Sequence, residues 1–147
     1  MAASAWRMYS EAKKYLWTGD LDLNGGGLRM KLLAGTKSAA VSNYTRSTFA
    51  SLTHIVTNVG TPVPTPANIY VSAGASAKEL RFTFDAVVFT ASGGNVTSIQ
   101  YAVLGISGGK ALGWCKLSTA VFTLSSGNTL TITPNASGVF TLTGDTT

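Results

Sequence analysis

The sequence has little of what disulfide-stabilised and metal-binding proteins are built from. It holds one cysteine and one histidine, which excludes an intrachain disulfide and any zinc site made of several cysteines. Charged residues make up only 12% of the chain, against about a quarter in an average domain. A surface with so few charges is either rich in serine, threonine and asparagine or partly covered by other protein chains.

Long apolar runs are also missing. A membrane-spanning helix needs about 20 consecutive apolar residues, and no stretch of the sequence offers them. Arg7, Glu11, Lys13 and Lys14 interrupt the N-terminal region in which a secretory signal would need an unbroken apolar segment. We therefore expect a protein that is made in the cytoplasm, is not secreted through a signal peptide and does not enter a membrane.

The basic balance of the chain has no clustered source. The formal net charge is +5, but the basic residues are scattered from Arg7 to Lys116, and Lys13 and Lys14 form the densest group. Affinity for nucleic acid grows with the number of phosphates neutralised together, so it requires clustered charge. We do not expect nucleic-acid binding.

Turn residues divide the C-terminal half into short strands. A chain of 147 residues with 45% apolar content is long enough for one domain, residues 1–147, with its own core. Gly- and Asn-containing turns separate β-branched and aromatic segments at regular spacing. The segments are 80–89, 99–106, 111–117, 120–124, 129–133 and 139–143, and the turn at 125–128 predicts that the fourth and fifth form a hairpin. This pattern predicts a mainly β fold, an antiparallel β-sandwich or small barrel.

The N-terminal region predicts one short helix, over residues 4–18 and within a helical segment 1–19. Large side chains recur there at spacings of three and four, which places on one face Trp6, Tyr9, Lys13, Leu16 and Trp17. Gly19 suits the position just after the helix. This face either packs on the domain's own sheet or anchors to a neighbouring subunit, because Trp and Tyr are enriched at interfaces.

Two segments in the middle of the chain differ in character. Residues 28–34 alternate apolar with basic side chains and predict a half-buried strand with Arg29 and Lys31 toward solvent. In the segment 60–68, proline at every second position favours extended backbone that cannot donate to a sheet ladder; the prolines are Pro62, Pro64 and Pro66. We expect this segment to be an arm or a connection. Periodicity does not decide between a strand and a helical turn for residues 49–56.

No residue pattern predicts catalysis or a cofactor. His54 has no nucleophile or orienting partner that the sequence assigns, so we interpret it as structural. Asp20 and Asp22, beside the Asn24–Gly27 loop, could bind Ca²⁺ weakly, although a structural turn is the simpler interpretation. A small hydrolase using Asp20, Asp22 and Asp85 is a third alternative. We expect no enzymatic activity, no metal and no cofactor.

Several segments together resemble small structural proteins of tailed bacteriophages. In these proteins a short helix leads into a Gly-x-x-Asp-Leu segment and then into a strand of alternating apolar and basic residues. The matching segments are 5–16, 19–23, 28–33, 44–53, 84–92, 99–104, 110–113 and 138–142. The chain departs from the pattern where Pro62–Pro66 replaces a Gly-rich stretch and where His54-Ile55 stands in place of an Asn-Glu pair.

The resemblance implies a virion component. We expect a capsid decoration or cement protein that binds the major capsid protein and copies of itself and stabilises the head. The expected partner contacts are Trp6, Tyr9, Leu16, Trp17, Pro62, Pro64 and Pro66. The alternative is a tail, collar or fibre-associated subunit, with Tyr70, Tyr101 or Trp114 exposed to a glycan.

Overall fold

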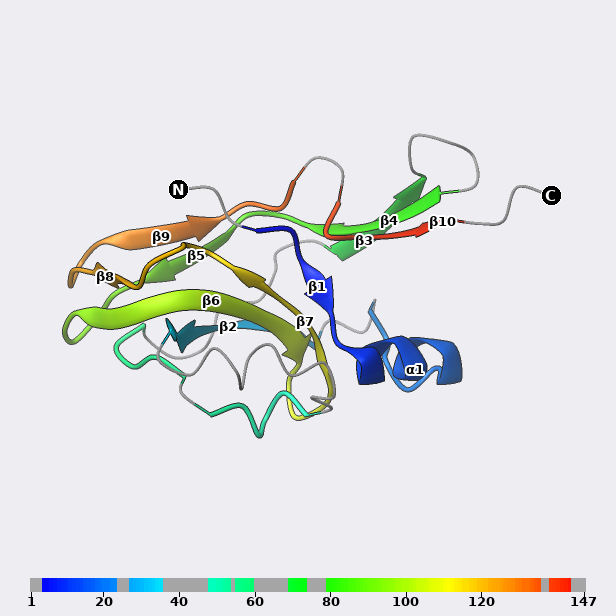
Figure 1. Cartoon of the computed structure of the whole chain (residues 1–147), viewed down its shortest axis with the longest axis horizontal. Helices are drawn as coiled ribbons and strands as arrows, with labels where there is room; N and C mark the ends of the chain where they lie inside the picture. The colour runs from blue at the N-terminus through cyan, green and yellow to red at the C-terminus, as the bar shows by residue number, and fades with distance from the viewer. Residues whose placement is uncertain are drawn as a thin grey trace.

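The fold is mainly β, with antiparallel sheets and one short N-terminal helix, as the sequence predicts. A computed structural model describes residues 4–23, 27–35, 48–53, 55–59, 69–73, 79–135 and 138–143 (Figure 1). The helix is α1 (Ser10–Thr18), and the strands are β1 (Arg7–Met8), β2 (Leu28–Ala34), β3 (Ile69–Ala73), β4 (Glu79–Phe84), β5 (Val87–Thr90), β6 (Val96–Ile106), β7 (Ala111–Lys116), β8 (Phe122–Leu124), β9 (Thr129–Ile132) and β10 (Phe140–Thr143). The described strands pair in an antiparallel sense and do not close into a barrel.

The largest sheet is built around β6. Its strand order is β1-β7-β6-β2, and β8 pairs with the first part of β6. The hairpin of β6 and β7 is closed by a turn in which the backbone N–H of Gly109 donates to Ile106 O and that of Ile106 donates to Lys110 O. The central position of β6 explains why it reads as a nearly continuous apolar run, since both of its faces are covered.

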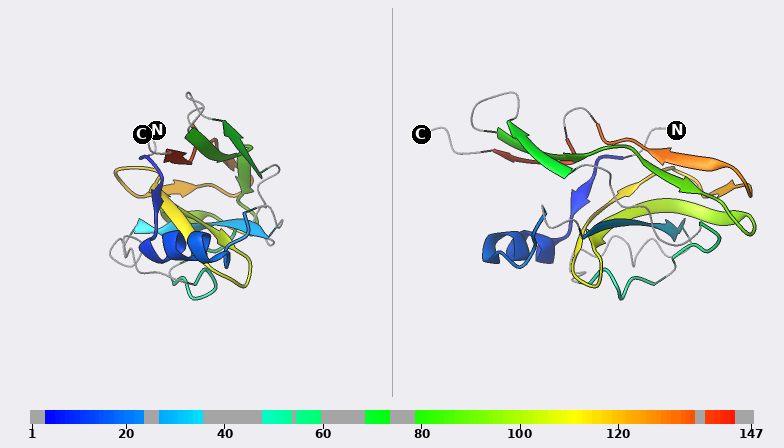
Figure 2. Two further views of the ribbon diagram at one scale, coloured as in Figure 1. Left: turned by 90° about the vertical axis from the view of Figure 1, so that its right-hand side faces the viewer. Right: turned by 180° about the vertical axis from the view of Figure 1, so that it is seen from behind.

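The second layer consists of two smaller sheets, β10-β4-β3 and β5-β9. Only two exposed residues, Asp85 and Ala86, separate β4 from β5. These two consecutive strands therefore connect the two smaller sheets. Figure 1 shows this layer above the larger sheet, and Figure 2 shows the same two layers from the end and from behind. The arrangement is sandwich-like.

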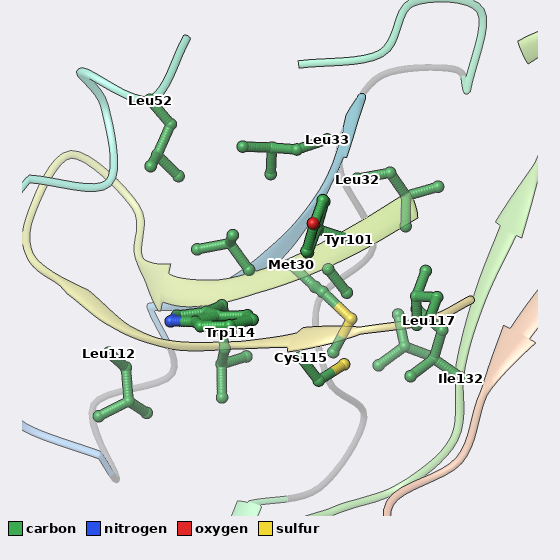
Figure 3. Packing of buried hydrophobic residues seen from close by; sticks show 14 of the residues in the cluster. Met30, Leu32, Leu33, Leu52, Tyr101, Leu112, Trp114, Cys115, Leu117 and Ile132 are labelled. Carbon is green, nitrogen blue, oxygen red and sulfur yellow. The ribbon is translucent and has the colours of Figure 1, made fainter. Parts of the chain in front are cut away.

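A continuous core fills the space between the layers. The inward side chains of β2, including Leu28, Met30 and Leu32, are at most 1% exposed, and burying each contributes about 1.5–3 kcal/mol. Cys115 of β7 and Ile132 of β9 belong to the same cluster, so it includes side chains from both layers (Figure 3).

The outer face of the large sheet is covered as well. The described residues of the segment 48–56 lie on it, with Phe49, Leu52 and Val56 buried. The backbone N–H of Phe49 donates to Gly109 O, and that of Val56 donates to Leu32 O. This segment, whose structure the periodicity did not decide, is a turn followed by an isolated bridge between Leu33 and Ile55.

The predicted start of the N-terminal helix is wrong. Residues 4–9 are not helical, and Arg7 and Met8 pair with Trp114 and Gly113 as β1. Tyr9, with φ −65° and ψ 145°, marks the change of direction, and its N–H donates to Leu112 O. An available strand edge on β7 therefore overrides local helix propensity over residues 4–9.

The predicted hairpin of residues 120–124 with 129–133 is also wrong. β8 pairs with β6 in one layer, whereas β9 pairs with β5 in the other. The turn between them is held by the turn that follows β5: the Gly127 N–H donates to Ala91 O, and the Ala91 N–H donates to Asn128 O. The chain thus changes layers at the point where a local pairing was expected.

Candidate functional site

An apolar groove lies where α1 faces the β10-β4-β3 sheet. Its volume is about 760 Å³. Most of its wall is apolar, and Lys13 is the one charged residue in the part of the lining that the structure describes. The described lining residues are Trp6, Met8, Lys13, Leu16, Trp17, Leu23, Phe82, Val139, Phe140 and Thr141. Figure 1 places α1 below β4 and β10 at the same end of the molecule.

The segment leading through β1 sends alternate side chains to opposite sides. Trp6 and Met8 line the groove, whereas the guanidinium of Arg7 lies 5.5 Å from the centre of the Trp114 ring. The Trp6 ring meets Phe84 edge-to-face, with centroids 5.9 Å apart and an interplanar angle of 88°. This alternation is the ordinary two-residue period of extended chain, and it fixes Trp6 as part of the wall.

Helix α1 supplies the opposite wall. Lys13, Leu16 and Trp17 are three and four residues apart, so they share a face of the helix. Ala12, one turn before Leu16, is fully buried and packs against the core, whereas Trp17 is 85% exposed. A tryptophan this exposed, at the edge of an apolar groove, is available to a partner.

The floor of the groove is aromatic. Phe82 and Phe140 stack across β4 and β10, with centroids 6.2 Å apart and an interplanar angle of 16°. The Val139 N–H donates to Phe82 O at 2.7 Å and continues the pairing of the two strands. Gly113 makes this packing possible, because a Cβ there would lie 2.6 Å from both the Arg7 carbonyl oxygen and Phe140 Cζ.

The structure brings together three of the residues expected to contact a partner. Trp6, Leu16 and Trp17 all line the groove. Tyr9 is fully buried in the chain's own core, so its side chain cannot reach a partner without unfolding. The segment 60–68, with Pro62, Pro64 and Pro66, lies outside the described residues, so the expectation of an extended arm stays a prediction.

Sequence reasoning missed the β-sheet wall. Phe82, Val139 and Phe140 are far from α1 in the chain, and nothing in their local pattern connects them with it. The one sequence feature that could have pointed to the groove is the spacing of Trp6 and Met8. In extended chain, residues two apart lie on the same side.

The aromatic side chains expected to face a glycan do not do so. Tyr101 and Trp114 are 5% and 6% exposed and pack against each other, with ring centroids 6.0 Å apart (Figure 3). The structure describes only the backbone of Tyr70. The glycan-facing surface built from Tyr101 and Trp114 is therefore incorrect, because these side chains are held inside the fold.

The residues considered for catalysis or metal binding form no such site in the part of the chain that the structure describes. Asp20, Asp22 and Asp85 are all exposed, and Asp20 Oδ2 accepts a hydrogen bond from the Thr18 hydroxyl at 2.7 Å. Within the described ranges, no three His, Cys, Asp or Glu side chains lie close enough together to hold a metal ion. His54 lies outside the described residues.

Two further ionisable groups have shifted pKa values. Burial raises the pKa of the Cys115 thiol to about 12, against an ordinary value of 9.0. Partial burial lowers the pKa of Lys31, whose ammonium donates to Phe49 O at 3.1 Å and lies 4.4 Å from the centre of that ring. Both groups are held within packed structure and lie outside the groove.

No protein-family model matches the chain, and neither the curated proteins nor the solved structures include one that is significantly similar to it. None of the described helices has the length and apolar content needed to cross a membrane.

Proposed function

We propose that the protein is a non-enzymatic structural subunit of a phage virion that docks on another virion protein through the α1 groove. The partner we propose is the major capsid protein, and the role is that of a capsid decoration protein that stabilises the head. The virion role rests on the resemblance of the sequence to small phage structural proteins. The docking role rests on the groove.

The observation that carries the docking role is the exposure of Trp17 beside an apolar wall. Tryptophan is among the residues that most often dominate binding energy at interfaces, where it fills a desolvated pocket in the partner. An aromatic side chain of this size buries about 150–250 Å² when it is covered. Leaving Trp17 in water is unfavourable for the isolated chain, and covering it favours association.

The low charge of the chain supports the same role. Interface cores are depleted of charged residues and enriched in Trp, Phe and Met, which is the composition of the groove lining. Folded elements form both sides of the groove. Binding of a partner therefore requires little ordering of this chain, and the entropy cost of association is lower.

The test is co-sedimentation of the purified chain with heads of the phage that encodes it, prepared without the protein. We expect Trp17→Ala to weaken binding at least about tenfold, because it removes a central apolar anchor. The matched control is Val121→Ala, since Val121 is 51% exposed and is not part of the groove. Equal binding by wild type and Trp17→Ala would contradict docking through the groove.

Location in a tail, collar or fibre is the competing assignment. It predicts binding of the same chain to tail fractions and no binding to heads. The co-sedimentation experiment separates the two when both fractions are used.

A further inference from the structure

We propose that the α1 groove takes a short apolar segment of its partner that carries a carboxylate, with the carboxylate paired to Lys13. This inference rests on the proposed docking function and specifies the chemistry of the segment that fills the groove.

The charge of the lining selects the charge of the occupant. Among the described residues that line the groove, Lys13 is the single charged one. Among the described residues, none forms an ion pair with its ammonium. Its aliphatic stem can cover apolar wall while the ammonium stays at the edge in water. A segment entering beside it gains by placing a carboxylate there.

The size of the groove selects a short segment. Sites of about 300–1,000 Å³ hold ligands of the size of a few side chains, and the volume here, about 760 Å³, lies in that range. The aromatic floor of Phe82 and Phe140 and the edge of Trp17 suit aliphatic or aromatic anchors. The geometry therefore points to a few apolar side chains next to one Asp or Glu.

Charge also argues against a second copy of the chain as the occupant. The formal net charge is +5, so two copies repel each other at neutral pH, whereas an acidic partner is attracted. Only six Asp and Glu residues exist in the whole chain to supply the carboxylate.

The test uses a fluorescein-labelled peptide in which leucine and phenylalanine flank a single glutamate, together with its twin that carries glutamine instead. Binding to the full chain is followed by fluorescence anisotropy. We expect the glutamate peptide to bind about three to five times more tightly, the upper part of the range for an exposed ion pair. The preference should disappear in Lys13→Gln and persist in Lys14→Gln, the matched control one residue along the same helix.

Four results would overturn the inference. Equal affinity for the two peptides would exclude the carboxylate, and a preference that survives Lys13→Gln would place it elsewhere. Tighter binding of sodium laurate than of the glutamate peptide would make the occupant a lipid. Concentration-dependent dimerisation that the peptide reverses would make it a second copy.

Failure of this inference can be distinguished from failure of the proposed function. Binding to heads that depends on Trp17, without a preference between the peptides, would support the docking role and contradict this inference. A preference for the glutamate peptide, without binding to any virion fraction, would support the proposed groove chemistry and contradict the virion role.

Discussion

At the scale of single residues, Gly113 is where β7 comes close to both β1 and the aromatic floor of the groove. The backbone of β1 and the ring of Phe140 occupy the space that a side chain there would need. The Phe140 ring can rotate away, but the Arg7 carbonyl oxygen belongs to a paired strand and cannot move alone.

Gly113→Ala should therefore destabilise the fold by about 1–3 kcal/mol, the usual cost of overpacking. Chemical denaturation measures the free energy of unfolding. Thr123→Ala, an exposed position on β8, serves as the control and should stay within about 0.5 kcal/mol of wild type. An unchanged stability of Gly113→Ala would show that β1 does not lie against β7 as described.

The buried thiol of Cys115 makes the stability of the fold depend on pH. Its thiol ionises near 9.0 when unfolded and near 12 when buried, so the unfolded chain loses this proton first as the pH rises. Stability is therefore fully present below about pH 9 and is lost toward pH 12, by about 1 kcal/mol per pH unit.

Guanidinium unfolding at two alkaline pH values tests this link. Between about pH 8.5 and 10.5, wild type should lose about 2 kcal/mol more than Cys115→Ala, in which the thiol is absent. The difference between the two proteins cancels the contribution of the tyrosines. Parallel pH profiles would mean that Cys115 is not buried in the native state.

At the scale of elements, the stability of α1 depends on its contacts with the core and on how the helix ends, and less on its length. A helix of nine residues is marginal in isolation, and Tyr9 provides no side-chain cap for the helix start. Gly19 ends the helix at φ 76°, in the left-handed region that residues with a Cβ enter at a cost.

Gly19→Ala should destabilise the protein by about 1 kcal/mol, and Gly19→Asn by less, because Asn tolerates this conformation better. Amide hydrogen exchange within α1, measured beside global unfolding, shows whether the loss is local to the helix. Equal stability of the Ala and Asn variants would contradict a left-handed Gly19.

The elements also show how far local patterns predict a fold. The bounds of the strand at 28–34 are predicted to the residue because basic and apolar side chains alternate there. Its second face is not left to solvent as expected, since Lys31 is partly buried against Phe49. β1 is missed because its two residues are strand only through pairing with β7, more than a hundred residues away. β3 (Ile69–Ala73) is missed as well, since its short apolar run follows the Pro-rich segment. The hairpin expected at 125–128 also fails because of a long-range contact. Backbone groups of this turn are hydrogen-bonded to Ala91, in the turn that follows β5.

At the scale of the whole molecule, the groove exists only because the two layers bring α1 and β10 to the same end. Sequence identified Trp6, Leu16 and Trp17 from their size and spacing, and it could not supply Phe82 or Phe140, whose position follows from long-range pairing. It also misplaced Tyr9, since periodicity does not distinguish a face turned to the core from one turned to a partner.

The central claim is that this chain is a structural part of a virion. Quantitative mass spectrometry of purified particles, separated into heads and tails, tests it most directly by counting copies of the chain relative to the major capsid protein. We predict copy numbers in the head fraction comparable to that of the major capsid protein. A few copies confined to the tail fraction would replace the capsid role with the tail assignment, and absence from both fractions would contradict the virion role.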